Sequence, residues 1–261
     1  MKTRLPPCCL ALLLLFGAIA NLSAAAQDTL GYHELRIYHV ASNKMDAVVT
    51  RFRDVVEPVR ARHKIKTLAY WSAPSKTNGG TFIYLMGANS RDELQTKEKA
   101  FREDPEFKAG YAASTKAHGK TVDQITTIPL KVGPAAAFNF GSPSSARTFD
   151  LRIYDVVPGK MEAFQNRWAQ HATRIYARHG LESIAWWVEA QGQSNDSATT
   201  DAQRFICLLA GESSDAITKA ISSFHADPEW QRIEKETEQN GKLRSAVTAY
   251  RLGPLPFSRL R

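Results

Sequence analysis

The chain has 261 residues, with 34 lysines and arginines against 26 acidic residues, a net charge of +8 and 43% hydrophobic residues. This apolar content can bury a core, so the composition excludes an intrinsically disordered chain. Three cysteines cannot cross-link a chain of this length, which excludes a disulfide scaffold. The basic residues form no Lys/Arg block, so we expect no nucleic-acid partner.

The first 26 residues have the features of a secretory signal peptide. Lys2 and Arg4 form a basic flank, residues 10–20 form a short apolar run, and residues 24–26 supply small side chains for cleavage. The run is shorter than the roughly 20 residues that a membrane span needs. We therefore expect residues 1–26 to be removed, no membrane span, and a secreted or periplasmic protein. Cleavage leaves Cys207, whose apolar neighbours predict a buried core residue.

Between residues 27 and 134 the hydrophobic period changes in a fixed order. Residues 33–40 alternate as a strand does, and apolar residues then recur at helical spacing from Met45 to Val59. Residues 67–71 and 81–86 predict two short strands, residues 91–117 a second helical stretch, and residues 121–132 a last strand. The order β-α-β-β-α-β predicts a ferredoxin-like α+β domain, with both helices on one face of an antiparallel sheet.

The second half of the sequence repeats the first. The segment ELRIY at 34–38 returns as DLRIY at 150–154, an offset of 116, and DPEF at 104–107 returns as DPEW at 227–230, an offset of 123. The seven extra residues fall in the polar stretch 191–200, which is typical of a loop. We predict a first domain at 27–134, an Ala- and Ser-rich linker at 135–147 and a second domain at 148–261.

A single sheet of this kind leaves one face uncovered. Glu34, Arg36 and Tyr38 form a half-polar face, opposite Leu35 and Ile37. We expect the half-polar faces of the two domains to be buried against each other, because neither domain can cover its own. The two halves would then form one barrel-like unit with pseudo-two-fold symmetry inside a single chain.

Several of these segments resemble the NIPSNAP family. They are the repeated strand, PGKMEAF at 158–164, ARHG at 177–180, Trp187, the segment at 224–230 and the closing Phe257-Ser258. The first copy departs from the family pattern, with Ala-Ser-Asn at 41–43 and with Lys64 in place of a glycine. The resemblance implies an intramolecular dimeric α+β barrel. That superfamily includes cofactor-free monooxygenases, small-molecule isomerases and haem-binding peroxidase-like enzymes, so the resemblance implies no single reaction.

His63 and His179 are the two histidines at matching positions, each at the end of the first helix of its domain. They are candidate proton acceptors at the mouth of a pocket between helix and sheet. The alternative is a helix-terminal residue that the macrodipole favours. Gly180 would let the backbone approach a ligand closely, which makes His179 the better candidate. The sequence has no HxxxH or CxxC spacing, so we expect neither a metal nor a cofactor.

The strand residues Arg36 and Tyr38, with their copies Arg152 and Tyr154, are further candidates. They could form a positive, hydroxyl-bearing wall that holds an anionic or phenolic ligand. The alternative is a salt-bridged polar layer between the sheets, formed with the acidic residue that starts each strand motif.

Trp71 and Trp187 are candidate ligand-binding residues, because both are large enough to line an apolar cavity; the alternative is a core role. Asp104 and Asp227 each precede a proline, which indicates a helix cap more strongly than a catalytic acid pair.

Three functions remain open. The first is an exported protein that binds a small apolar or aromatic molecule between sheet and helices. The second is a cofactor-free monooxygenase or isomerase, in which a repeated histidine is the base and Arg36 or Arg152 holds an oxyanion. The third is a structural or protein-interaction scaffold, and a homo-oligomer of the two-domain chain is compatible with each. The absence of P-loop, G-x-S-x-G and dinucleotide-binding motifs disfavours ATPases, serine hydrolases and Rossmann dehydrogenases.

Overall fold

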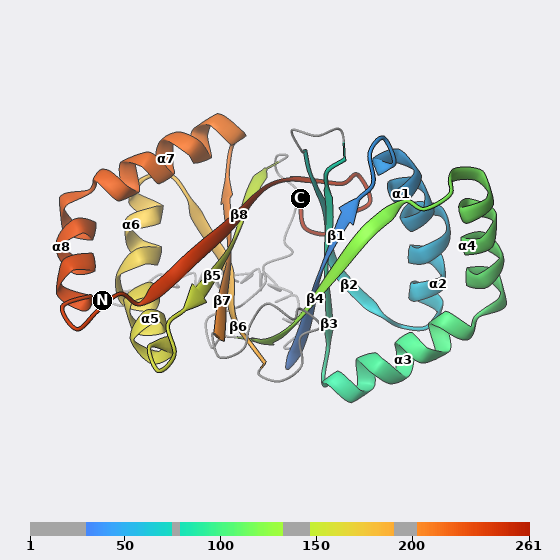
Figure 1. Ribbon diagram of the computed structural model, residues 1–261, viewed down its shortest axis with the longest axis horizontal. Helices are drawn as coiled ribbons and strands as arrows, with labels where there is room; N and C mark the ends of the chain where they lie inside the picture. The colour runs from blue at the N-terminus through green and yellow to red at the C-terminus, as the bar shows by residue number, and fades with distance from the viewer. Residues whose placement is uncertain (1–29, 75–78, 133–146, 191–202) are drawn as a thin grey trace, which may run out of the picture.

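The computed structural model describes residues 30–74, 79–132, 147–190 and 203–261. The predicted signal peptide, the predicted loop at 191–200 and all but the last residue of the predicted linker lie outside these ranges. Each half has the predicted β-α-β-β-α-β order (Figure 1). The first half comprises β1 (Tyr32–Val40), α1 (Met45–Arg51), η1 (Phe52–Val56), α2 (Glu57–Arg62), β2 (Lys66–Ala73), β3 (Thr81–Ala88), α3 (Arg91–Glu103), α4 (Pro105–His118) and β4 (Val122–Val132). The second half comprises β5 (Thr148–Val156), α5 (Met161–Arg167), η2 (Trp168–Ala172), α6 (Thr173–Arg178), β6 (Glu182–Glu189), β7 (Gln203–Gly211), α7 (Ser214–Ala226), α8 (Pro228–Thr237) and β8 (Arg244–Pro254).

The eight strands close into one barrel, in the order β1-β3-β2-β8-β5-β7-β6-β4. Each half contributes four antiparallel strands, and two short seams join the halves. At these seams β2 pairs with β8 through two residue pairs and β4 pairs with β6 through three. The helices of each half cover the outside of its own sheet, at opposite ends of the molecule in Figure 1. The intramolecular α+β barrel is therefore confirmed.

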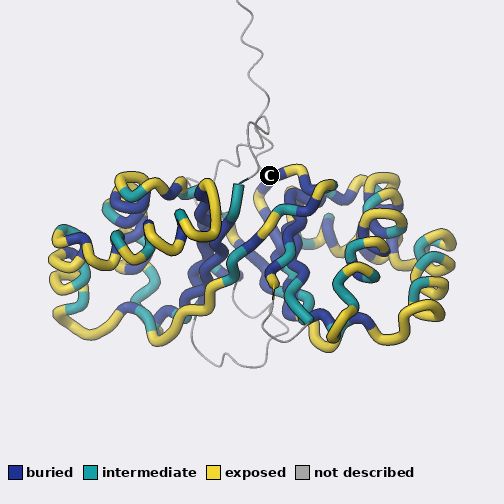
Figure 2. The backbone as a smooth tube through the Cα atoms, turned by 90° about the horizontal axis from the view of Figure 1, so that it is seen from above, coloured by how far each residue is buried: buried dark blue, intermediate teal, exposed yellow. Residues whose placement is uncertain are grey.

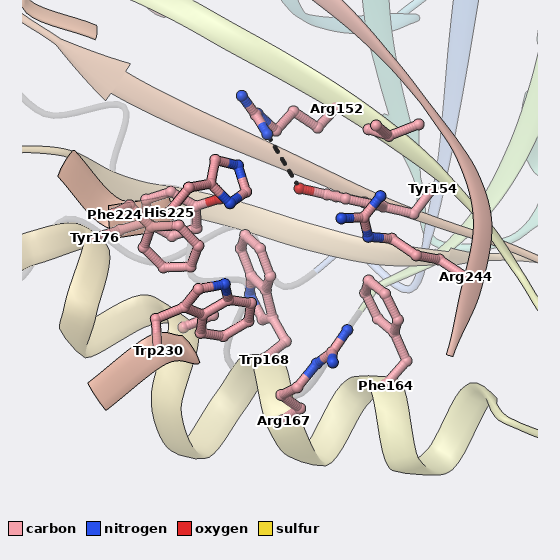
Figure 3. Close-up of a pocket in the computed structure, with 12 residues that line it drawn as sticks. Arg152, Tyr154, Phe164, Arg167, Trp168, Tyr176, Phe224, His225, Trp230 and Arg244 are labelled. Carbon is pink, nitrogen blue, oxygen red and sulfur yellow. Dashed lines mark hydrogen bonds between the residues drawn. The ribbon is translucent and has the colours of Figure 1, made fainter. Parts of the chain in front are cut away.

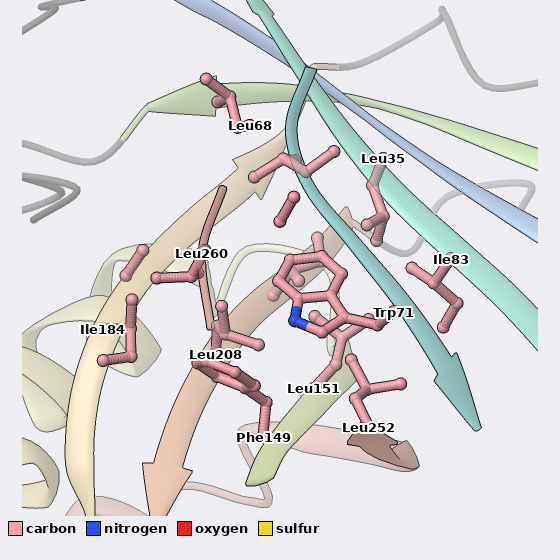
Figure 4. Close-up of a cluster of buried hydrophobic side chains, with 14 of the residues drawn as sticks. Leu35, Leu68, Trp71, Ile83, Phe149, Leu151, Ile184, Leu208, Leu252 and Leu260 are labelled. Atoms are coloured by element: carbon pink, nitrogen blue, oxygen red, sulfur yellow. The ribbon is translucent and has the colours of Figure 1, made fainter. Parts of the chain in front are cut away.

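The barrel interior is an apolar core that both halves build. Leu35 from the first half and Leu151 from the second lie around the buried indole of Trp71 (Figure 4). Ile37 belongs to the same buried cluster. Figure 2 shows buried backbone through the central strands and exposed backbone along the outer helices. The expectation that the half-polar strand faces meet between the sheets is wrong, because the apolar faces meet there.

The half-polar faces lie under the helices instead. Tyr38 packs against Phe52 of η1, with ring centroids 5.6 Å apart, and Arg36 reaches Glu98 on α3. Helices can bring charged side chains over a strand to pair with Arg36, whereas an apolar sheet face opposite it could not. Its ion pair with Glu34 is present as predicted, but on the helix side of the sheet.

The first helix of each half contains a π-helical turn. The segments α1, η1 and α2 run continuously, and α5, η2 and α6 repeat them at the offset of 116. The sequence predicted a helix here, and the wider turn is a finding of the structure. Such turns are rare and often occur at functional sites, and these two bring Phe52 and Trp168 toward the sheet, where both side chains are buried.

The second helical stretch of each half is divided at the predicted aspartate caps. The Asp104 carboxylate accepts hydrogen bonds from the backbone N–H groups of Glu106 and Phe107, and so begins α4. Asp227 caps α8 in the same way. Cys207 is buried as predicted, and burial raises the pKa of its thiol far above the ordinary value. No helix among the residues described is long and apolar enough to span a membrane.

Candidate functional site

Each half has a pocket between its sheet and its helices, and the two pockets differ greatly in size. The first-half cavity, between β1, β4, η1, α3 and α4, has a volume of about 780 Å³. The second-half pocket has a volume of about 50 Å³ (Figure 3). Small-molecule sites have volumes of about 300–1,000 Å³, whereas a few water molecules would fill the second pocket. Of these two pockets, the first-half cavity is the one of ligand size.

Aromatic and apolar side chains form much of the first-half cavity wall. Phe52 and Val56 come from η1, Phe101 from α3, and Phe107 and Tyr111 from α4. The predicted candidates Arg36 and Tyr38 lie on β1 and line the same cavity. The structure thus combines an aromatic wall with a basic, hydroxyl-bearing strand.

A network of arginines and tyrosines underlies this strand. The Arg36 Nη1 atom donates to the Tyr84 hydroxyl at 3.3 Å, and the Arg60 Nη2 atom donates to the same hydroxyl at 3.1 Å. The Tyr38 hydroxyl lies 3.1 Å from the Tyr84 hydroxyl. Glu98 accepts from Arg36 and lies 3.5 Å from Arg60, so one carboxylate serves two guanidinium groups.

Two arginines on one phenol change its acidity. Burial acts to raise the pKa of Tyr84, but the charges of Arg36 and Arg60 outweigh it, so the pKa is lowered. Burial and the neighbouring Tyr84 oxygen raise the pKa of Tyr38 well above its ordinary value. These opposite shifts favour a charge-stabilised Tyr84 oxygen that accepts a hydrogen bond from Tyr38. Tyr38 lines the cavity, and Tyr84 is fully buried beside it.

The second half has the same strand residues but a reduced polar network. Arg152 donates to Asp150 at 2.6 Å and to Tyr154 at 3.5 Å, and both Arg152 and Tyr154 line the small pocket (Figure 3). The rest of the network is replaced: the positions of Arg60, Tyr84 and Glu98 hold Tyr176, Cys207 and Ile221.

Larger side chains at equivalent positions fill the second pocket. Trp168 occupies the position of Phe52, and Trp230 occupies that of Phe107. Both tryptophans are buried and line the pocket (Figure 3). These two exchanges put larger side chains into the second pocket, and α4 (14 residues) is also longer than α8 (10 residues).

The repeated histidines lie at helix ends. His63 Nε2 lies 2.8 Å from the Asp104 carboxylate, and His179 Nε2 lies 2.8 Å from that of Asp227. Neither histidine is among the described residues that line the two pockets. This geometry corresponds to the helix-terminal alternative. Gly180 has φ +85° and a Cβ there would meet no atom within 4 Å, so it serves the left-handed turn and makes no close approach.

Trp71 and Trp187 lie inside the barrel and line neither of the two described pockets. Trp71 packs on Phe149, with ring centroids 5.9 Å apart. Trp187 donates from Nε1 to the Nδ1 atom of His33 at 2.9 Å. The structure thus places both tryptophans in the core. No cluster of three His, Cys, Asp or Glu residues suited to a metal occurs among the residues described.

Further residues of the site were not identified from the sequence, among them Arg51, Arg60, Tyr84 and Glu98. Arg51 could have been, because it precedes Phe52 just as Arg167 precedes Trp168 at the same offset. Arg60 and Tyr84 are not repeated in the second half, so a search for matching residues passes over them. Their buried placement depends on the packing of the helices on the sheet.

The barrel and its paired pockets define a class of protein built from two ferredoxin-like repeats. The sequence matches the NIPSNAP family over residues 33–134 and again over residues 149–259, so the chain belongs to the NIPSNAP family. None of the curated proteins compared with the chain matches it.

A solved structure with a TM-score above 0.5 has a similar fold. A "putative monooxygenase" from Fusobacterium nucleatum subsp. nucleatum is 10% identical, with a TM-score of 0.56 over 87% of this chain and 93% of that one. A NIPSNAP family protein of unknown function from Agrobacterium tumefaciens is 17% identical, with a TM-score of 0.37 over 45% of this chain and 96% of that one. The likeness to the Fusobacterium structure, at 10% identity, establishes similarity of fold only.

Proposed function

We propose that the chain binds a small, largely apolar or aromatic molecule in the first-half cavity, and that the second half serves as its structural partner. The observation that carries this proposal is the contrast between about 780 Å³ in one half and about 50 Å³ in the other. A void of this size costs packing energy. The cavity is open in the first half and filled in the second, so the fold itself does not require it. This difference favours a binding role for the open cavity.

The test exchanges cavity side chains between the halves. Phe52→Trp with Phe107→Trp installs the second-half residues in the first-half cavity, and should weaken binding of 2-naphthol or indole at least tenfold. The matched control is Trp168→Phe with Trp230→Phe, which makes the reverse exchange and should leave the affinity unchanged. Calorimetric titration of the full chain measures both. Equal affinities in the three proteins would refute binding in this cavity.

The second candidate is a cofactor-free isomerase or monooxygenase. The specific observation in its favour is the Tyr38–Tyr84 pair, in which Tyr38 lines the cavity and Tyr84 accepts hydrogen bonds from two guanidinium groups. A Tyr84 phenolate would accept a proton passed on by Tyr38, and Arg36 would stabilise an oxyanion of the substrate. Tyr84→Phe should then abolish turnover while the affinity for 2-naphthol is retained. A protein that binds its natural ligand and returns it unchanged would support the binding function instead.

We also propose that the protein is exported, with cleavage after Ala26. This proposal rests on the basic flank, short apolar run and small residues of the N-terminal sequence. The intact mass of the protein purified from its native compartment tests it. A mass that includes Met1, or a protein confined to the cytosol, would contradict export.

A further inference from the structure

A buried arginine in the first-half cavity has no acidic partner among the residues that the structure describes. Arg51 is 6% exposed and lines the cavity. Its Nε atom has no hydrogen-bond partner, and no described residue makes an ion pair or hydrogen bond with its guanidinium. The guanidinium carbon lies 5.0 Å from the centroid of the Tyr111 ring. A buried charge without a counter-ion is costly, so this one indicates that a partner comes from outside the chain.

The second half contains the corresponding arginine with its partner in place. Arg167 occupies the position of Arg51 and its side chain is 3% exposed. It points into the second-half pocket from the helix that carries Phe164 and Trp168 (Figure 3). Its Nη1 atom donates to the Glu238 carboxylate at 2.9 Å and to the Thr237 hydroxyl at 3.2 Å. In this copy the chain itself supplies the anion.

The first half has a neutral residue at the position of that anion. The residue equivalent to Glu238, at the offset of 123, is Thr115, which lines the first-half cavity. Helix α8 ends at Thr237, whereas α4 continues to His118 and carries Thr115 within a regular helical turn. At the sequence position of the second-half carboxylate, the first half therefore has a neutral hydroxyl that lines the cavity.

The other acidic groups around the cavity are already paired. Glu98 contacts Arg36, Arg60 and Arg102, and Asp123 pairs with Lys120 at the exposed rim. The lining thus contains five cationic side chains and two carboxylates: Arg36, Arg51, Arg60, Arg102 and Lys120 against Glu98 and Asp123. The lining therefore has an excess of positive charge, and no acidic residue of the lining pairs with Arg51.

We propose that the molecule bound in the first-half cavity is an organic anion, a small aromatic or apolar carboxylic acid. Its carboxylate takes the place beside Arg51 that Glu238 takes beside Arg167, and its apolar body contacts the aromatic wall. This inference rests on the proposed binding function and names its ligand class. Charge-assisted hydrogen bonds from a buried arginine are strong and specific for carboxylates.

The first experiment compares an acid with its neutral isostere, 2-naphthoate with 2-naphthamide, by calorimetric titration at constant ionic strength. The native chain should bind the acid at least tenfold more tightly. Arg51→Met should weaken binding of the acid about 10- to 100-fold and leave the amide unchanged, because it removes a charged hydrogen-bond donor. Arg53→Met is the matched control. It removes the same charge from the same helix, but at a side chain that is 53% exposed and paired with Asp54.

The second experiment supplies the anion from the chain. Thr115→Glu copies the second-half carboxylate beside Arg51, and should abolish binding of 2-naphthoate while raising the thermal unfolding midpoint of the ligand-free protein. Thr115→Gln has the same length without the charge, and should do neither. The two readouts are independent, so a variant that disturbs the helix can be recognised by its lower midpoint.

The outcomes separate this inference from the proposed function. If the acid and the amide bind equally tightly and Arg51→Met affects both alike, the cavity is a binding site but its ligand is not an anion. If Arg51→Met and Arg53→Met weaken the acid equally, net charge explains the preference and Arg51 does not. If neither probe binds, the proposed binding function fails, and the inference fails with it.

Discussion

Acidification should destabilise the barrel through one buried histidine. His33 lies on β1, is 2% exposed, and accepts a hydrogen bond at Nδ1 from the Nε1–H of Trp187 on β6. An indole N–H can only donate, so the Nδ1 atom of His33 must be unprotonated in the native state. The bond connects the two halves, and protonation of His33 would replace its acceptor with a second donor.

The size of the effect follows from the pKa of this residue. Burial lowers the pKa of His33 from 6.5 to about 4, and one unit of difference corresponds to about 1.4 kcal/mol. The unfolded chain takes up a proton below pH 6.5 that the native chain does not. Stability is therefore complete above pH 6.5 and falls by about 3 kcal/mol as the pH drops to about 4.

Urea unfolding of the full chain at pH 7.5, 6.5, 5.5 and 4.5 measures this loss. His33→Gln retains an acceptor for Trp187 but cannot be protonated in this range, so its free energy of unfolding should change much less. His118→Gln, on the exposed end of α4, is the control and should follow the native curve. Protonation of the capping aspartates reduces stability only at lower pH. Hydrogen bonds with His179 and Arg178 hold the pKa of Asp227 well below its usual range. If the free energy of unfolding falls equally steeply with decreasing pH in the native chain and in His33→Gln, the reasoning is refuted.

Three further predictions concern the core, the helix ends and the two halves. Trp71→Ala should cost about 3–5 kcal/mol in chemical denaturation, because it opens a hole inside the barrel; a small cost would place the indole outside the core. His179→Ala should lower stability by about 1 kcal/mol or less through its lost hydrogen bond, with the affinity for 2-naphthoate unchanged; lost affinity at full stability would return it to the site. Residues 27–140 alone should self-associate in sedimentation experiments, because separation exposes an apolar sheet face and two strand edges; a dispersed monomer would contradict this.

The sequence predicted the fold because the duplication and the change of hydrophobic period are both properties of the chain itself. The orientation of the sheet was predicted wrongly, because β1 is buried on both faces and alternation alone cannot say which face meets the helices. Glu34, Arg36 and Tyr38 form one face in either case. The helix-borne Glu98, which pairs with Arg36 there, was not recognised.

The candidate site was predicted in part. Arg36 and Tyr38 line the large cavity and Arg152 and Tyr154 line the small one, whereas the repeated histidines and Trp71 lie elsewhere. A search for residues that the two copies share finds mainly the residues that the common fold requires. The features that distinguish the first half arise where the copies differ, and cavity volume depends on how those side chains pack.

The joining of both halves in one chain has a consequence for how their pockets can change. In a symmetric homodimer every substitution appears twice, so a tryptophan that fills one pocket fills its symmetry mate as well. Here each half is encoded separately, and Trp230 can occupy one pocket while Phe107 leaves the other open. The closed half can then gain packing energy that supports the shared barrel, and the open half can keep a hollow that no symmetric assembly could confine to one side.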